Sequence, residues 1–474
     1  MTYARGLSGT IRRGTPNRPS RASTASVVAS IQGVHVKAAA LGASLCQAMR
    51  ILGRSHKRIR AFPGTSVSTR SDREVDPRSV GLRPEDIEAI WAAVVSFYEA
   101  GLHPALGLCI RRRGEVVLDR TIGHARGNSP KDDDDAELVA ATPDTLFSFF
   151  SGSKVVTATL VHLLADREQL SVDDPIAKFI PEFARNRKHR ITIRQLLSHQ
   201  AGIPDVPPEL LDLELLQTPD RILSAIYDLE PRFEPGAVPA YHTLTGGFVL
   251  AELIQRVSGT GIREFLAKEI GEPLGMGHFN YGVAEDELDD VAVDAFTGPT
   301  PGWPMKQVLG KALGLSMPEL VDTINDPRFR TGVVPSANLI GTTNEISRFF
   351  DMLVNGGVYG GHRILSPTTI AKAIEPQSPG RFDRIIKIPM AYSMGFMLGN
   401  DPVGFYGPWA GRAFGHIGLM NIMGWADPER DLAVALTNTG KPMPSIDTIR
   451  WFEILRQINT RVPRDGTGPL RQLR

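Results

Sequence analysis

The chain has 474 residues, of which 42% are hydrophobic and 22% are charged, and its net charge is +1. This composition is typical of a soluble globular protein, and the length is sufficient for one large domain or two medium ones. The sequence has only two cysteines and contains no HExxH, no Walker loop and no GxGxxG after a strand, so it excludes a disulfide framework, and we expect no cofactor, no metal and no nucleic-acid partner.

The charge is unevenly distributed along the chain. Residues 1–71 contain 12 Lys or Arg and no acidic residue, which leaves 41 basic residues and all 52 acidic residues for the remainder, a net charge of −11. A shift of this kind marks a boundary. We therefore predict a basic arm over residues 1–80, partly disordered, followed by an acidic body over residues 81–465.

The arm contains a helix-like stretch that follows a segment rich in Arg, Ser, Gly and Pro. Polar residues interrupt the stretch and a polar segment precedes it, so it is typical neither of a transmembrane span nor of a secretory signal. Its apolar or small residues recur at steps of four and three, which predicts one helical face: Val27, Ile31, Val34, Ala38, Leu41, Leu45, Ala48 and Leu52.

Three roles remain open for the arm. Its helix could pack on the body or on a partner chain. Residues 25–60 could instead lie on anionic lipid as a peripheral membrane contact, or the arm could be an organelle presequence, since it is rich in Arg and Ser and poor in acids. We expect a cytoplasmic protein, with peripheral membrane association as the alternative, and the sequence does not indicate an oligomeric state.

The body begins with a helix and a hairpin. Residues 83–101 have apolar side chains at helical spacing and end at a glycine, which predicts a helix. Residues 105–125 predict two strands joined by a turn at Arg113-Gly114, with Cys109 buried in the first strand. The acidic run 131–137 lacks the spacing of a calcium loop and predicts a solvated loop.

The rest of the body predicts an α+β fold. Residues 153–330 are mainly helical with Pro-rich connections, of which 296–306 could overhang a site. We expect an antiparallel sheet flanked by helices, built from residues 81–150 and 335–465, with a mainly helical lobe, residues 151–334, inserted between them. The later predicted elements are a helix at 342–357 and strands at 391–398, 413–428 and 431–440.

Residues 151–154, Ser-Gly-Ser-Lys, lie where an aromatic run meets an apolar, helix-like segment. Ser151 and Lys154 share one face if the segment is a helix, because they are three residues apart. A serine hydroxyl needs a base, and a lysine whose pKa is lowered by burial or by nearby positive charge can serve. A helix start also offers free N–H groups. Taken alone, the pattern is also that of a capping serine followed by a solvated lysine.

This is the only S-x-x-K in the chain, and four further stretches accompany it: ITIRQLLSHQAGIPD (191–205), EPGAVPAYHTLTGGFVLAELIQRVSG (234–259), LIGTTNEISRFFDMLVNGG (339–357) and FGHIGLMNIMGWADPERDLAVALTN (414–438). In their order and spacing they resemble the serine β-lactamase and penicillin-binding-protein superfamily, in particular the class C β-lactamase-related, family VIII carboxylesterase-like branch. The resemblance covers about residues 85–460 and not the basic arm. No G-x-S-x-G elbow of an α/β-hydrolase occurs.

The resemblance implies a role for individual residues. Ser151 would be the acylated nucleophile. Lys154 and Tyr241 would share the proton transfers, in an order that the sequence leaves open. The oxyanion hole would consist of the backbone N–H groups of Ser151 and Leu419.

Two motifs depart from the β-lactamase pattern. Tyr-x-Asn is replaced by Tyr241-His242-Thr243, and Lys-Thr-Gly by His416-Ile417-Gly418. Thr243 lacks the amide of Asn, His416 is only partly charged near neutral pH, and Ile donates no side-chain hydrogen bond. Gly418 would still let a strand edge approach the substrate. We predict substrate-binding positions at Thr243, His416 and Gly418 that favour a neutral ester over an anionic amide.

The leading hypothesis is therefore a serine carboxylic-ester hydrolase, an esterase or lipase, acting on a small-molecule ester. A β-lactamase or D-aminoacyl peptidase with the same nucleophile is the first alternative, and a non-catalytic filament-forming or scaffold relative is the second. Trp303, Phe405 and Trp409 could line an acyl or alcohol pocket, or could be ordinary core and loop aromatics.

Overall fold

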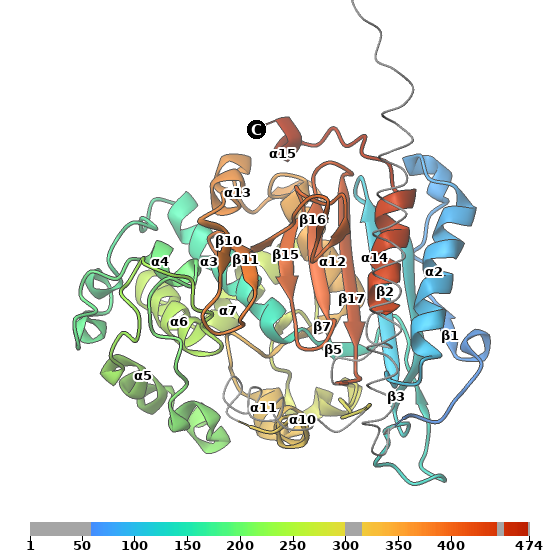
Figure 1. The fold of residues 1–474 in the computed structure, drawn as a ribbon, viewed down its shortest axis with the longest axis horizontal. Coiled ribbons are helices and arrows are strands. Elements are labelled where there is room, and N and C mark those ends of the chain that lie inside the picture. Colours follow the sequence, from blue (N-terminus) through green and yellow to red (C-terminus); the bar gives the residue numbers. More distant parts are fainter. Residues whose placement is uncertain (1–57, 299–314, 443–449, 473–474) are drawn as a thin grey trace, which may run out of the picture. The chain divides into compact units, whose positions relative to one another are not determined.

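A computed structural model describes residues 58–298, 315–442 and 450–472 (Figure 1). They belong to one compact unit that extends from Ser55 to Arg474. The predicted arm helix and most of the 296–306 connection lie outside the described residues. Within the described ranges, no helix combines the length and the apolar character needed to cross a bilayer.

A ten-stranded antiparallel sheet forms the centre of the fold, in the order β1-β3-β2-β17-β16-β15-β12-β11-β10, with β4 paired to β3. As predicted, both ends of the body contribute to it, because β2 pairs with β17 from Arg112 opposite Leu432 to Leu106 opposite Asn438. The strands are β1 (Ser68–Arg70), β2 (Ala105–Arg112), β3 (Glu115–Arg126), β4 (Val139–Ala140), β10 (Ser378–Phe382), β11 (Pro389–Tyr392), β12 (Met397–Leu398), β15 (Phe414–Ile417), β16 (Met423–Asp427) and β17 (Leu432–Asn438).

Helices cover both faces of this sheet (Figure 1). The helices α2 (Pro84–Tyr98) and α14 (Arg450–Arg461) share one hydrophobic cluster, and α12 (Thr343–Val354) belongs to another. The predicted helices at 83–101 and 342–357 are thus present, each within a few residues of its predicted ends.

Strand β17 shows how the sheet separates the two layers. Leu432 and Val434 are buried in the cluster of α2 and α14, whereas Ala433 and Ala435 are buried in the cluster of α12. The alternation follows from the two-residue period of a strand. The small alanine side chains allow α12 to approach the sheet closely.

The predicted boundary at residue 80 is placed too late. Strand β1 pairs with β3, and Ile59 and Val80 are buried in the cluster that contains α2. The basic charge that suggested the boundary is partly neutralised inside the body, since Arg70 forms an ion pair with Glu74 at 2.6 Å. A count of charges could not detect this pairing.

Two turns decide how the predicted strands at 105–125 and 391–398 appear in the structure. The predicted hairpin turn is present, and Arg113 and Gly114 both have positive φ, 53° and 87°, as a two-residue hairpin turn requires. The predicted strand 391–398 is divided in two, because Gly395, with a φ of 99°, reverses the chain and lets Tyr392 pair with Met397.

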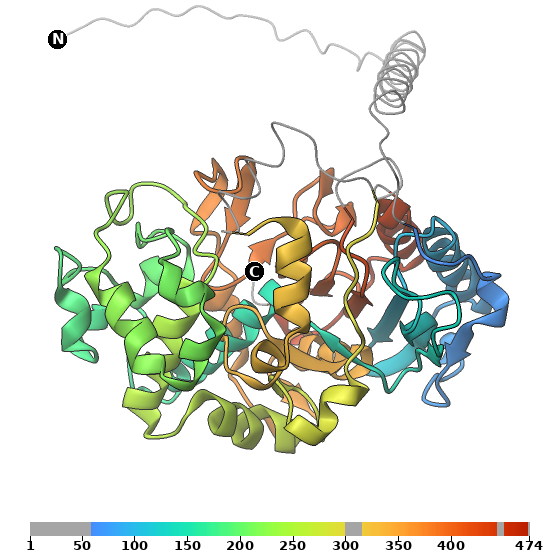
Figure 2. The same cartoon turned by 90° about the horizontal axis from the view of Figure 1, so that it is seen from below.

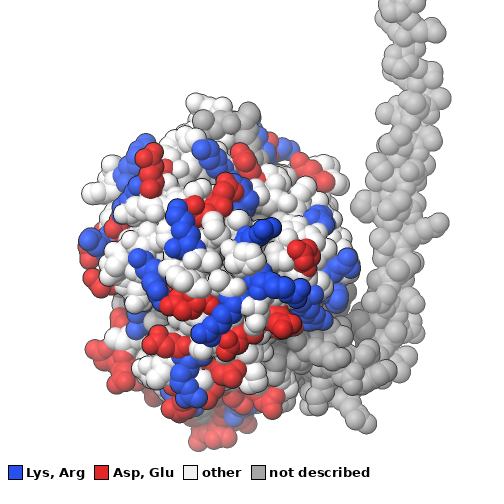
Figure 3. Space-filling model, turned by 90° about the vertical axis from the view of Figure 1, so that its left-hand side faces the viewer, with Lys and Arg blue, Asp and Glu red and all other residues white. Residues whose placement is uncertain are grey.

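The inserted lobe is mainly helical, as predicted, and lies beside the sheet (Figures 1 and 2). Basic and acidic side chains are intermixed on its outer face (Figure 3). Its helices and those that follow are α3 (Ser153–Asp166), α4 (Ile193–Leu197), α5 (Pro219–Asp228), α6 (Thr245–Ser258), α7 (Ile262–Leu266), a π-helical turn (Ala267–Gly271), α8 (Glu272–Leu274), α10 (Met317–Asn325), α11 (Pro327–Thr331), α13 (Pro367–Ala373) and α15 (Pro469–Gln472). Three small sheets consist of β5 (Leu146–Ser148), β7 (Leu339–Thr342) and β6 (Asn280–Tyr281), of β8 (Val358–Tyr359) and β9 (His362–Arg363), and of β13 (Val403–Gly404) and β14 (Gly407–Pro408).

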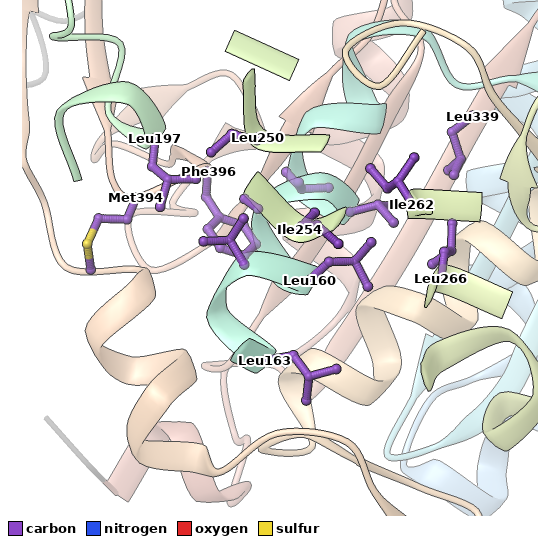
Figure 4. Packing of buried hydrophobic residues seen from close by; sticks show 14 of the residues in the cluster. Leu160, Leu163, Leu197, Leu250, Ile254, Ile262, Leu266, Leu339, Met394 and Phe396 are labelled. Carbon is purple, nitrogen blue, oxygen red and sulfur yellow. The ribbon is translucent and has the colours of Figure 1, made fainter. Parts of the chain in front are cut away.

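Helix α3 runs through the middle of the protein and is buried from Ser153 to Leu164. Leu160 and Leu163 lie among apolar side chains from other elements, including Ile254 of α6 and Phe396 beside β12 (Figure 4). A helix that is buried on all sides in this way belongs to the core. The start of α3 is therefore held firmly in place.

We predict that Arg430 is a major contributor to the stability of the fold. Its buried guanidinium contacts Asp427 at 2.6 Å and donates to the carbonyls of Asn459 and Val462, at 2.9 and 3.1 Å, near the end of α14. Arg430→Ala leaves Asp427 buried and unpaired, and should lower the free energy of unfolding by about 3–5 kcal/mol. Denaturant titration followed by circular dichroism measures the loss.

The control for this prediction is Arg456→Ala. Arg456 pairs with Glu453 at 2.6 Å, but both side chains are exposed on α14, so the loss should stay below about 1 kcal/mol. Equal losses in the two variants would show that Arg430 has no special structural role.

Candidate active site

Ser151 lies on a tight turn between β5 and α3. The turn is a 3-10 helix from Phe150 to Gly152, and Phe150 has a left-handed φ of 47°, which is strained for a non-glycine residue. A side chain on Gly152 would clash with the Phe149 ring, so glycine is required there. The hydrogen bonds of the turn use the N–H groups of Gly152 and Ser153, and they leave the Ser151 N–H for another acceptor.

Lys154 points back at Ser151 from the first turn of α3. Its Nζ lies 3.3 Å from the Ser151 Oγ and donates to the Ser336 carbonyl at 3.0 Å. Lys154 is only 9% exposed, and this burial lowers the pKa of its amine to about 7. A substantial fraction of the amine is therefore neutral at physiological pH and can accept a proton.

Tyr241 covers the same amine just before α6. The Lys154 Nζ lies 4.9 Å from the centre of the tyrosine ring. Burial raises the pKa of the Tyr241 phenol above its usual range, while a hydrogen bond with Ser151 opposes the shift. The phenol therefore stays protonated, and its oxygen can both accept and donate. The structure brings together the three residues predicted as catalytic.

Two buried histidines hold Tyr241 in place. His199 packs against the Tyr241 ring with 4.6 Å between ring centres. The backbone N–H of His242 donates to the Nδ1 of His199 at 3.2 Å, and the N–H of Ile203 donates to the Nε2 of His242 at 3.3 Å. His242 therefore carries its proton on Nδ1, which faces the His199 Nδ1 at 3.4 Å. Burial lowers the pKa of both imidazoles, that of His242 to about 3, so both are neutral.

Tyr241 belongs to a small cluster of buried aromatic and apolar side chains. Tyr392 stacks on Tyr241 with 6.5 Å between ring centres, and Phe405 packs against the same cluster. Trp409 does not join it: the Trp409 side chain is half exposed, and its carbonyl accepts a hydrogen bond from Arg430. Trp303 lies outside the described residues.

His416 stands near the end of β15, with its ring centre 6.2 Å from that of Tyr241. Its Nδ1 donates to the Ile417 carbonyl at 2.7 Å, so its Nε2 is a bare acceptor, and this atom is buried with no partner among the described residues. Burial lowers the pKa of His416 to about 3. The expectation of a partly charged imidazole is therefore wrong, because the side chain is buried.

Gly418 and Leu419 lie beside the turn that carries Ser151. A Cβ on Gly418 would stand 2.7 Å from the Phe149 carbonyl, so its lack of a side chain allows β15 to contact the backbone that carries Ser151. The Leu419 N–H has no acceptor within the described part of the chain, and neither does the half-buried side chain of Thr243. Among the described residues, no acceptor is bonded to the N–H group of Leu419 or of Ser151.

Asn438 of β17 holds the turn that presents Leu419. Its Nδ2 donates to the Met420 carbonyl at 2.8 Å. Behind it, the Lys441 amine donates to the Asn438 backbone carbonyl at 3.0 Å and forms a fully buried ion pair with Asp294 at 2.7 Å. The ring of Phe150 lies 5.0 Å from the same amine. One buried cation thus contacts the Phe150 ring on the Ser151 turn and the asparagine that holds the Leu419 turn.

The sequence did not single out His199, Ser336 or Asn438. His199 and Asn438 carry a signal, because each lies inside a stretch that resembles the superfamily, whereas the contact of Ser336 arises only from the tertiary fold. Among the described residues, no group of three or more His, Cys, Asp or Glu side chains is arranged to hold a metal ion.

The chain is similar to several known proteins. It is 25% identical over 441 residues to the esterase/beta-lactamase LipL of Mycobacterium tuberculosis, covering 88% of this chain and 95% of LipL. Its structure is similar to that of a penicillin-binding-protein homologue from Caulobacter crescentus (27% identity, TM-score 0.68, covering 79% and 98% of the two chains). It is also similar to a family VIII carboxylesterase (27% identity, TM-score 0.68, covering 80% and 98%).

The family model described as Beta-lactamase matches residues 92–457, which include every residue of the candidate site. The fold, an antiparallel sheet with an inserted helical lobe, is that of the solved relatives. The chain therefore belongs to the beta-lactamase family of serine hydrolases.

Proposed function

We propose that the protein is a serine carboxylic-ester hydrolase that works through an acyl-enzyme on Ser151. The observation that carries the proposal is the 3.3 Å contact between the Ser151 hydroxyl and the buried Lys154 amine, whose pKa is about 7. A neutral amine at this distance can remove the serine proton, directly or through the Tyr241 phenol.

Acylation and deacylation use the same groups. The Ser151 oxygen forms a bond to the ester carbonyl carbon while its proton passes to Lys154 or Tyr241. The oxyanion is stabilised by the N–H groups of Ser151 and Leu419, each such donor being worth about 3–4 kcal/mol. The stored proton then goes to the departing alcohol as the C–O bond breaks. In deacylation, a water molecule gives a proton to the same base and attacks the acyl carbon. The Ser151 oxygen then takes the proton back as its bond to the acyl group breaks, and the carboxylic acid is released.

The electrostatics of the site favour a neutral substrate. Where β-lactamases have the lysine of Lys-Thr-Gly, this chain has a neutral His416, and the next residue, Ile417, offers no side-chain donor. Apolar side chains around Tyr241 and Phe405 adjoin the nucleophile. The names of two relatives, a family VIII carboxylesterase and an esterase/beta-lactamase, support the same choice.

A panel of aryl and alkyl esters of varied acyl length, together with one cephalosporin, tests the proposal. We expect the wild-type enzyme to hydrolyse the esters faster than the cephalosporin. Ser151→Ala should lower ester turnover by about 10³-fold or more, because it removes the nucleophile. A fluorophosphonate probe should label the wild type at Ser151.

The matched control is Ser171→Ala, an exposed serine beyond the end of α3, which should keep wild-type turnover. Equal ester turnover in wild type and Ser151→Ala would refute the proposal. Cephalosporin turnover that rivals ester turnover would favour the β-lactamase alternative on the same nucleophile.

The pH dependence of kcat/KM should report the Lys154 amine. Acylation requires the neutral amine, so activity on an uncharged ester should fall as pH decreases through about 7 and should reach a plateau above it. Stopped-flow or spectrophotometric assays with an aryl acetate measure the profile. A profile without this acidic limb would show that Lys154 is not the titrating base.

The Lys154→Met variant should be inactive yet more stable than wild type. The pKa of the amine is 10.5 in the unfolded chain and about 7 in the folded protein. Below pH 10.5, folding of the wild type must therefore either release the proton of the amine or bury its charge, and both cost free energy. The gain in the free energy of unfolding should reach about 4 kcal/mol near pH 7 and decline toward zero as pH approaches 10.5.

Denaturant titrations of Lys154→Met at several pH values measure this gain, with Lys131→Met, an exposed lysine, as the control that should change little. A gain that does not vary with pH would mean that methionine improves packing and that the buried amine carries no ionisation cost.

A further inference from the structure

We propose that the hairpin tip formed by residues 381–388, between β10 and β11, is a docking surface for anionic lipid. The inference concerns a different segment from the basic arm. β10 is the last strand of the sheet, at the end that adjoins the helical lobe (Figure 1). Phe382, Ile386 and Ile388 are 48%, 36% and 40% exposed. Three of the seven exposed large apolar side chains among the described residues thus lie on this tip. Contact of such a group with water is unfavourable, so the group indicates a binding surface.

Cations alternate with these apolar side chains. Arg381, Arg384 and Lys387 are exposed, and none of them forms an ion pair within the described ranges. The one acidic residue of the tip, Asp383, is buried and turned inward. The exposed face of the tip is therefore both apolar and positively charged. Its apolar side chains can enter the acyl-chain region of an anionic membrane while its cations contact the lipid phosphates.

The tip is rigid, so its apolar side chains are held outward. The Asp383 Oδ1 accepts from the N–H groups of Ile385 and Ile386, at 2.7 and 2.8 Å, and the Lys387 N–H donates to the Asp383 carbonyl at 3.1 Å. The Asp383 Oδ2 accepts from the Tyr392 hydroxyl at 3.1 Å. The same carboxylate thus shapes the tip and anchors it to the core.

The tip is also joined to the candidate active site. Tyr392 stacks on Tyr241, and Ile385 packs against the same cluster. The Arg384 N–H donates to the carbonyl of Pro239, which precedes Tyr241 by two residues, at 3.0 Å. A lipid surface bound at the tip would therefore lie beside the site in which, on the proposed function, an ester is cleaved.

The small size of the surface favours lipid over a protein partner. A stable protein interface engages about 20–30 residues on each side, whereas this surface comprises eight. A few apolar side chains with adjacent cations suffice for reversible binding to a membrane surface, because insertion of each chain and contact with phosphates add together.

A local fluorescent probe tests the contact without interference from the arm. The full chain with Cys46→Ser and Ile386→Cys is labelled with an environment-sensitive fluorophore, since Cys109 is fully buried and burial raises the pKa of its thiol. Vesicles of phosphatidylcholine with phosphatidylglycerol should shift the emission to shorter wavelength and raise its intensity. Pure phosphatidylcholine vesicles should do so much less.

The matched control carries the label at Val403→Cys, a 56% exposed apolar position on a different hairpin, where no shift is expected. An unchanged emission at residue 386 would overturn the proposal even if the chain bound vesicles through its arm. A shift of equal size with both vesicle types would overturn the role of the cations.

A variant with Phe382→Asp, Ile386→Asp and Ile388→Asp gives a second readout. Hydrolysis of a soluble aryl acetate should be unchanged, whereas hydrolysis of an ester embedded in anionic vesicles should fall by about tenfold or more. An equal rate on embedded ester would count against lipid docking. Absence of esterase activity in the wild type would refute only the proposed function, because the fluorescence shift does not depend on catalysis.

Discussion

The chemistry of this site depends on keeping one amine away from water. Lys154 projects from a helix that is buried along most of its length, and its amine is enclosed by a serine hydroxyl, a backbone carbonyl and the face of a tyrosine. An exposed lysine would be charged at physiological pH and could not accept a proton. The aromatic and histidine side chains around Tyr241 and the dense packing of α3 are therefore parts of one arrangement that excludes solvent.

The basic side chains inside the site carry little uncompensated positive charge. Lys154 titrates near neutrality, Lys441 is neutralised by Asp294, and His416 is uncharged. On the exposed hairpin tip, by contrast, Arg381, Arg384 and Lys387 have no ion pair with any described residue. This distribution fits a substrate whose reacting part is neutral and whose surroundings carry negative charge, as an ester in a lipid layer would.

Patterns that depend on local periodicity were predictable, and contacts between distant segments were not. The strand at 431–440 and the helix at 342–357 were predicted from their residues and are present. The Ser151–Lys154 spacing predicted that the two side chains would meet, although Ser151 lies on the 3-10 turn before α3. The burial that makes His416 neutral depends on side chains from several elements. The charge count misplaced the start of the body, because ion pairs within the fold cannot be read from composition.

The pairing of β2 with β17 has a consequence for how the protein is made. The N–H of Ala105 donates to the side chain of Thr439, 334 residues later in the chain, and the turn that presents Leu419 is held by Asn438 on the same strand. Contacts of such long range form late and slowly. During synthesis, the site cannot be completed before β17 has been made and has paired with β2. We therefore expect the nascent chain to gain hydrolytic activity only after β17 has been made.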